Sequence, residues 1–86
     1  MNITNVKIRR IFEEDALKAV CSLTIDGELA IHDIKLVQAG GKIIVVMPAK
    51  KTAKGEFVDI VHPINSKTRS IIENAIITEY SSIIKK

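Results

Sequence analysis

The sequence predicts an α+β fold: a mainly antiparallel β-sheet of about five strands, followed by a C-terminal α-helix. Three observations support this fold class. Apolar and polar side chains alternate at period two in the first half of the chain, as in strands with one buried face. The dipeptide Asp26-Gly27, between two such runs, is typical of a tight hairpin turn. From Lys67 onward the apolar side chains follow a helical period.

The chain has 86 residues, of which 47% are hydrophobic and 27% charged, so we expect one small domain over residues 1–86. Its expected elements are strands at about 2–12, 16–25, 29–37, 42–47 and 57–61 and a helix at about 66–84. A domain of this size buries only about 60% of its unfolded surface, so a partner subunit would add to its stability.

The first hairpin is the clearest local prediction. Residues 2–12 are rich in β-branched side chains, and the acidic triplet 13–15 has no apolar period, which indicates a turn. Between Leu17 and Ile25 the apolar residues fall on one face of the strand. Asp26-Gly27 then favours a type I′ turn, because both of its central residues need a positive φ.

The next strand changes phase in its middle. Its apolar residues are, in order, Leu29, Ile31, Ile34 and Leu36. The first pair and the second pair have opposite parity, so in a regular strand they would face opposite sides of the sheet. A β-bulge near His32-Asp33 would correct this phase, and we predict one there.

The last strands are short. Gly40-Gly41 indicates a turn, and the apolar strand 42–47 after it ends at Pro48. Residues 49–56 contain three lysines and no apolar period, so we expect a loop. Alternation returns at 57–61, which we expect to form the fifth strand of the sheet.

The C-terminal helix should begin at Asn65 or Ser66, since either side chain can cap the first free N–H groups. Its apolar stripe contains Ile72, Ile76, Tyr80 and Ile83, widened by Ile71, Ala75 and Ile84. Ile77 lies outside this stripe. The apolar surface is broader than one small sheet needs, so we expect a second copy of the chain to cover part of it in a homodimer.

Composition excludes several classes of protein. A single cysteine, Cys21, excludes an intrachain disulfide, and with two histidines it leaves too few ligands for structural zinc. We expect Cys21 to be a buried hydrophobe and the protein to need no metal or cofactor. Aromatic residues are 3% of the chain, which argues against an aromatic platform for stacked bases.

No arrangement of side chains indicates catalysis, and we expect the protein not to be an enzyme. His32 and Asp33 are explained by the bulge, and His62 by backbone contacts at the corner before the helix. Glu56 and Asp59 form neither a catalytic pair nor a metal cage. The longest uncharged apolar run, 43–49, is far shorter than a membrane span, and no signal peptide precedes it, so we expect a cytoplasmic protein.

Positive charge is concentrated in one third of the chain. The segment from Lys42 to Arg69 contains six basic and two acidic residues, whereas the rest of the chain contains seven basic and eight acidic residues. The basic residues in question are Lys50, Lys51 and Lys54 in the expected loop and Lys67 and Arg69 in the first helical turn, besides Lys42. Positive charge at a helix N-terminus is unfavourable for the helix dipole, so this placement favours a docked anion such as phosphate. The alternative is a lysine-rich solvated surface.

Several segments resemble the SpoVG family (stage V sporulation protein G). They are Val6-Lys7-Ile8-Arg9-Arg10, Ile31-His32-Asp33-Ile34-Lys35, Met47-Pro48-Ala49-Lys50-Lys51-Thr52, Gly55 through Ser66, and Thr68-Arg69. The resemblance covers essentially the whole chain. It implies a small bacterial cytoplasmic homodimer, connected with sporulation, septum formation and gene regulation, that binds DNA and in some cases RNA.

The resemblance also implies which residues contact nucleic acid. Lys50, Lys51 and Arg69 match the family's positions, and charge mapping adds Lys54 and Lys67. Arg9 and Arg10 are further candidates, although strand arginines can pair with the neighbouring acids Glu13 and Glu14.

Two departures from the family pattern bear on these contacts. Ala49 stands where a serine is usual, and Lys51 where an arginine is usual. Lysine contacts a phosphate as a point charge, whereas arginine can do so with two hydrogen bonds.

Two functions are therefore compatible with the sequence. The first is a dimeric nucleic-acid-binding regulator that uses the basic loop and the helix start. The second is a protein-interaction module of the division or sporulation machinery, in which the basic loop meets an acidic partner. Concentrated charge favours the first, and the scarcity of aromatic residues favours the second.

Overall fold

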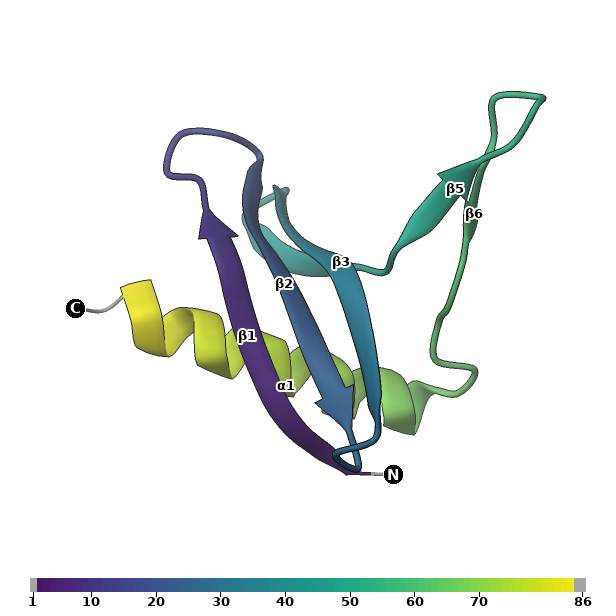
Figure 1. Ribbon diagram of the computed structural model, residues 1–86. Helices are drawn as coiled ribbons and strands as arrows, with labels where there is room; N and C mark the ends of the chain where they lie inside the picture. Colours follow the sequence, from purple (N-terminus) through teal and green to yellow (C-terminus); the bar gives the residue numbers. More distant parts are fainter. Residues whose placement is uncertain (1, 85–86) are drawn as a thin grey trace.

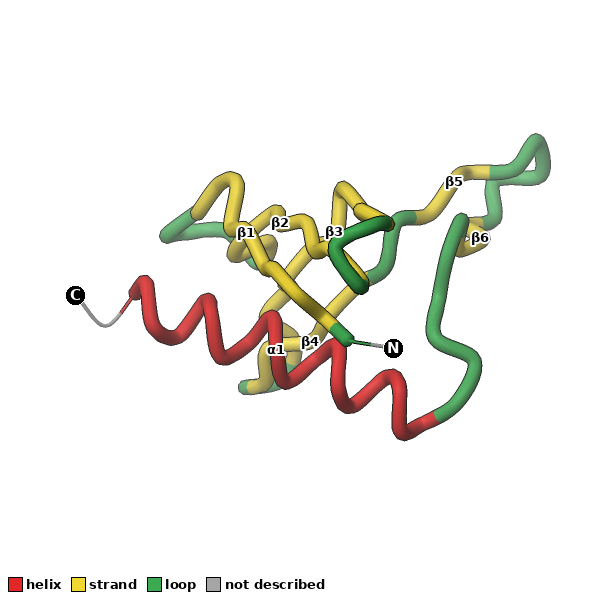
Figure 2. Tube along the Cα trace, turned by 60° about the horizontal axis from the view of Figure 1, so that its bottom comes forward, coloured by secondary structure: helices red, strands yellow, loops and turns green. Residues whose placement is uncertain are grey.

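A computed structural model describes residues 2–84 and confirms the α+β class (Figure 1). The main sheet is antiparallel, with strand order β1-β2-β3-β4. Its strands are β1 (Ile3–Ile11), β2 (Leu17–Ile25), β3 (Leu29–Ala39) and β4 (Lys42–Val46). Helix α1 (Ser66–Ile84) lies across one face of this sheet, as the view in Figure 2 shows. A separate hairpin contains β5 (Ala49–Lys51) and β6 (Phe57–Asp59).

The β2–β3 turn has the predicted geometry. Asp26 and Gly27 have φ values of 54° and 66°, both in the left-handed region that a type I′ turn requires. The turn is closed by a hydrogen bond from the Glu28 N–H to the Ile25 carbonyl oxygen, 3.0 Å long. The residues at this turn therefore set the register in which β2 and β3 begin to pair, with Ile25 opposite Leu29.

The predicted bulge at His32-Asp33 is confirmed. Cys21 pairs with Ile34 and Leu23 with Ile31, so one residue of β2 opposes two residues of β3. Asp33 has a φ of 62°, which is the local distortion that absorbs the extra residue. As a result Ile31 and Ile34 both point into the core despite their opposite parity.

The core lies between α1 and the main sheet. Its buried residues are Ala19, Cys21, Leu23, Ile31, Ile34, Leu36, Ile72, Ile76 and Tyr80. Ile72, Ile76 and Tyr80 of the predicted stripe form the buried face, with Ile76 fully buried at its centre. Ile71 and Ile84, which were expected to widen the stripe, are exposed. The expectation that Ile77 lies outside this face is wrong, because Ile77 is partly buried against the core.

Cys21 is a core residue, as expected. It is 0% exposed, and its thiol lies 3.5 Å from the carbonyl oxygen of Ile34. Burial raises the pKa of the Cys21 thiol from 9.0 to about 11, because the thiolate is poorly solvated there. The thiol is therefore protonated at neutral pH and is not an activated nucleophile.

The main sheet has four strands, and the expected loop at 49–56 is partly a strand. Residues 49–51 pair with 57–59, so the segment at 57 forms a hairpin instead of joining the sheet. Pro48 explains the difference, because it has no N–H and ends the strand that it follows. Beyond Pro48 the chain leaves β4 and finds its backbone partners in its own return segment.

The hairpin, which we call the arm (residues 49–59), projects from the body of the molecule (Figure 1). Its two strands contact each other and no other helix or strand among residues 2–84. All of its residues are exposed. None of the helices within residues 2–84 is long and apolar enough to cross a membrane.

Candidate nucleic-acid interface

Three of the predicted site residues lie together on the arm. Lys50 and Lys51 are on β5, directly opposite Val58 and Phe57 of β6. Residues that pair directly share a face of a two-stranded ribbon. Lys51 and Phe57 therefore lie on one face, and Lys50 and Val58 on the other. The arm presents an ammonium group beside an apolar side chain on both sides.

The tip of the arm is closed by a local hydrogen-bond network around Thr52. The Thr52 N–H donates to the Glu56 carbonyl oxygen (2.7 Å), and the Gly55 N–H donates to the Thr52 carbonyl oxygen (3.0 Å). The Thr52 hydroxyl oxygen accepts a further bond from the Glu56 N–H, 3.2 Å long. Gly55 has a φ of 84°, a backbone conformation that residues other than glycine rarely adopt. These contacts hold Lys54 at the apex.

Lys67 and Arg69 lie in the first turn of α1. Asn65 caps this helix, because its side-chain oxygen accepts a 2.7 Å hydrogen bond from the Thr68 N–H. The Arg69 N–H makes the first helical bond, to the Asn65 carbonyl oxygen at 3.1 Å. The first turn has no acidic residue, so nothing within that turn balances its two cationic side chains.

The arm and the helix start lie at the same end of the molecule but form two separate cationic patches. The segment 60–65 connects them along that end (Figure 1). A shallow depression of about 440 Å³ lies at the helix start, lined by His62, Ile64 and Arg69 among others. His62 Nδ1 lies 3.2 Å from the carbonyl oxygen of Pro63, in agreement with the expected backbone contact.

Arg9 and Arg10 do not belong to either patch. They are on β1, and the arm is continuous with β4, at the opposite edge of the main sheet. The Arg9 Nε–H donates to the Ser22 hydroxyl at 3.3 Å. The Arg10 guanidinium lies over the ring of Phe12, 5.2 Å from its centroid. Both contacts are within the body of the molecule, apart from the arm and the helix start.

The sequence analysis missed a set of exposed apolar side chains around the arm. They are Phe57, Val58, Ile60, Val61 and Ile64, of which Phe57 is 74% and Ile64 87% exposed. Alternation at 57–61 had suggested a strand with a buried face. The signal that could have corrected this is the pair of prolines, Pro48 and Pro63, which bracket the segment and separate it from the sheet.

Together these features define a class of protein: a small two-layer α+β domain with a projecting β-hairpin that carries both lysines and exposed apolar side chains. Within residues 2–84, no group of three or more His, Cys, Asp or Glu side chains is placed to hold a metal ion.

The chain belongs to the SpoVG family, whose model matches residues 1–82. It is 48% identical over 80 residues to the "Putative septation protein SpoVG" of Thermoanaerobacter sp., covering 93% of this chain and 87% of that protein. The protein of the same name from Acetivibrio thermocellus is 48% identical over 83 residues, covering 96% of this chain and 88% of the relative. The Bacillus cytotoxicus relative, also so named, is 46% identical over 80 residues, covering 93% of this chain and 82% of its own length.

Proposed function

We propose that this protein is a homodimeric regulator connected with septation, which binds nucleic acid through the phosphate backbone. The observation that carries the proposal is the placement of Lys50, Lys51 and Lys54 on one projecting hairpin. In this proposal the arm contacts DNA, and in some cases RNA, in the cytoplasm of a bacterium. Arg69 and Lys67 add a second contact at the helix start.

Physical chemistry supports phosphate contacts by the arm. Lysine ammonium groups neutralise phosphates and release counterions, which gives affinity with little dependence on sequence. A two-stranded ribbon also has the right dimensions to enter the major groove, which is about 12 Å wide. Because the arm lysines are exposed, they can reach phosphates without rearrangement of the body.

The apolar residues of the arm support a dimer. An isolated two-stranded hairpin is at best marginally stable in water. The arm strands contact no other helix or strand among residues 2–84, so contact with another molecule would stabilise the arm. In the proposed dimer a second copy covers Val58 and Ile60 on the ribbon face that they share. Two arms related by a two-fold axis would then reach two sites on one duplex.

The experiment is fluorescence anisotropy with labelled duplex DNA, single-stranded DNA and RNA, repeated over a salt series. The test variant is Lys50→Ala/Lys51→Ala/Lys54→Ala. The control removes three lysines of the main sheet: Lys7→Ala/Lys35→Ala/Lys42→Ala. Both variants lose the same charge, so long-range attraction falls equally in both.

We expect the arm variant to bind more than tenfold more weakly and to lose up to about 0.9 in salt slope per lysine. The control variant should keep most of the slope. If wild type does not bind even at low salt, or if the two variants behave alike, the proposal is wrong.

A different observation supports a second candidate function, binding to a protein partner. Phe57 lies opposite Lys51 and Val58 lies opposite Lys50, so each face of the arm carries one lysine and one exposed apolar side chain. Such a surface could bind an acidic protein partner that also offers apolar contacts. In that case the arm would serve the division machinery and not nucleic acid. Nucleic-acid binding that is absent or insensitive to the arm variant would favour this alternative.

A further inference from the structure

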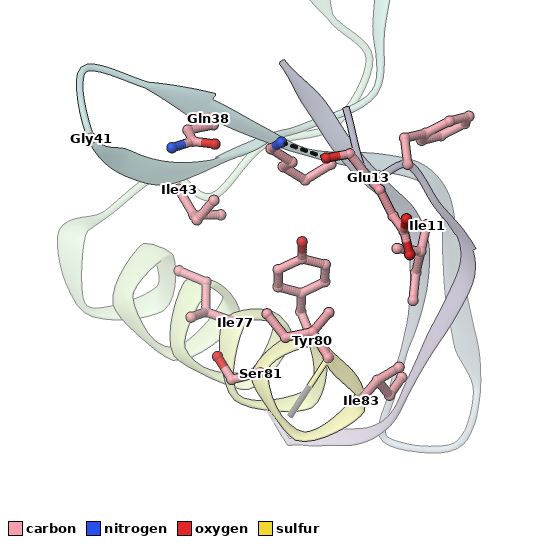
Figure 3. A pocket seen from close by; sticks show the side chains of 12 residues that line it. Ile11, Glu13, Gln38, Gly41, Ile43, Ile77, Tyr80, Ser81 and Ile83 are labelled. Carbon is pink, nitrogen blue, oxygen red and sulfur yellow. Dashed lines mark hydrogen bonds between the residues drawn. The ribbon is translucent and has the colours of Figure 1, made fainter. Parts of the chain in front are cut away.

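A second concave site lies at the end of the molecule away from the arm. It is a cavity of about 630 Å³ between the C-terminal half of α1, the β1–β2 connection and the β3–β4 hairpin (Figure 3). Its apolar walls are the side chains of Ile11, Ile43, Ile77, Ile83 and Ile84. None of these residues belongs to the proposed nucleic-acid interface, so the cavity requires a separate explanation.

Tyr80 provides a polar group inside this cavity. The residue is only 8% exposed, yet its hydroxyl points into the cavity in Figure 3. Among residues 2–84, no hydrogen bond joins this hydroxyl to another side chain or to the backbone. The hydroxyl oxygen itself is accessible from the cavity, because among residues 2–84 no buried side-chain oxygen or nitrogen lacks a partner. It is therefore free to bind a ligand that enters the cavity.

Two further donors face the same space. Lys18 Nζ donates a 3.3 Å hydrogen bond to the Glu13 carbonyl oxygen, the dashed line in Figure 3, and its other two N–H groups remain. The Gln38 side chain lies on the β3–β4 hairpin, up and to the left of the Tyr80 hydroxyl, with its amide oxygen on the nearer side (Figure 3). Rotation of the amide by 180° would turn its N–H groups toward the cavity. The Glu13 carboxylate lies beside Ile11, on the side away from Gln38. The group that would best satisfy an ammonium, an amide and a phenol together is an anionic oxygen.

We propose that this cavity binds a small aliphatic carboxylate. The carboxylate head accepts hydrogen bonds from Lys18, Gln38 and Tyr80, and the hydrocarbon chain packs among the isoleucines. The cavity volume is within the range of about 300–1,000 Å³ that is usual for small-molecule sites. Walls of branched aliphatic side chains match a flexible hydrocarbon chain, and each methylene that enters them should tighten binding by about fourfold.

The protein contains its own reporter for this site. Tyr80 is the only tyrosine and the chain has no tryptophan, so intrinsic fluorescence comes from inside the cavity. The experiment titrates the full chain with butanoate, hexanoate and octanoate. We expect a saturable change in Tyr80 fluorescence, with affinity rising along the series. Octan-1-ol, which has a similar chain and no charge, should bind more weakly than octanoate.

Lys18→Met tests the carboxylate contact and keeps an apolar stem of similar length. It should weaken octanoate binding by about tenfold and leave octan-1-ol binding unchanged. The matched control is Lys54→Met on the arm, which removes the same charge at the other end of the molecule. Tyr80→Phe removes only the hydroxyl; NMR of the isoleucine methyl groups then replaces fluorescence and should show octanoate binding weakened several-fold.

The proposal is overturned if octanoate produces no saturable change in wild type. It is also overturned if Lys18→Met and Lys54→Met lose affinity equally, or if the shifted isoleucine methyl groups lie outside the cavity. Since every readout is independent of nucleic acid, failure here would leave the proposed function of the arm intact, and failure of the arm experiment would leave this site intact.

Discussion

The body and the arm of this protein use apolar side chains in opposite ways. In the body, α1 and the main sheet bury a contiguous core, with Ile34, Leu36 and Ile76 at 0% exposure. In the arm no residue is buried, and Phe57 is 74% exposed. The body can therefore fold as a unit on its own contacts, whereas the apolar surface of the arm has no partner within residues 2–84. The comparison indicates that the arm is the part of the chain made to contact another molecule.

Substitutions in the core should have the largest effect. Ile76→Ala removes a side chain that is 0% exposed, and we expect it to lower the free energy of unfolding by about 2–5 kcal/mol. Phe57→Ala on the arm, at a side chain that is 74% exposed and outside the face covered in the proposed dimer, should cost less than about 1 kcal/mol. Urea unfolding followed by circular dichroism at several protein concentrations measures both. A cost for Phe57→Ala as large as that for Ile76→Ala would remove the distinction between body and arm.

The dimer gives the second test. Val58→Asp/Ile60→Asp places two charges on the arm face that the second copy covers in the proposed dimer, and it should weaken dimerisation at least about a hundredfold, or about 2.7 kcal/mol. Light scattering at micromolar concentration should give about twice the 9.5 kDa chain mass for wild type and a single chain mass for the variant. A wild-type protein that is monomeric under these conditions would contradict the proposed dimer.

The pKa of Cys21 predicts a pH dependence that belongs to the body. The folded pKa of about 11 exceeds the ordinary value of 9.0 because burial disfavours the thiolate. The contribution of the protonated Cys21 thiol to stability is therefore complete below about pH 9 and is lost as the pH rises through 11, up to about 3 kcal/mol. Comparing alkaline urea unfolding of wild type and Cys21→Ala isolates the effect of the thiol, since all other ionisable groups are the same in both proteins. Equal pH slopes in the two would mean that the thiolate is tolerated in the core.

The smallest expected effect is at the tip of the arm. Gly55→Ala places a side chain at a φ of 84°, which should cost about 1 kcal/mol of hairpin stability, although the new Cβ meets only Lys51 Cε at 3.9 Å. Nucleic-acid affinity should fall several-fold while the unfolding midpoint of the body is unchanged. Gly55→Asn is the matched control, because asparagine tolerates the left-handed region. Equal behaviour of both variants would show that tip geometry does not affect binding.

The sequence by itself determined the features that depend on neighbouring residues. Alternation at period two predicted β1 to β3, and the apolar run between Gly41 and Pro48 predicted β4. Asp26-Gly27 predicted the I′ turn, and the change of parity at His32-Asp33 predicted the bulge. The helical spacing of apolar residues also predicted the buried stripe of α1 that contains Ile76. Each depends on the steric preferences of a few adjacent residues or on the regular spacing of side chains along one element. The lysines of the candidate site could be found in the same way, because they are close in sequence.

Only the tertiary structure decided how these elements are distributed in space. It separated the 57–59 strand from the sheet, because Pro48 ends β4 and the segment pairs with Ala49–Lys51 instead. It placed Arg9 and Arg10 on the far edge of the main sheet, with Ser22 and Phe12 as their contacts. It also brought Lys18, Gln38 and Tyr80 around one cavity. The physical reason is the same in each case: these arrangements depend on contacts between residues far apart in sequence, which no local pattern of side chains records.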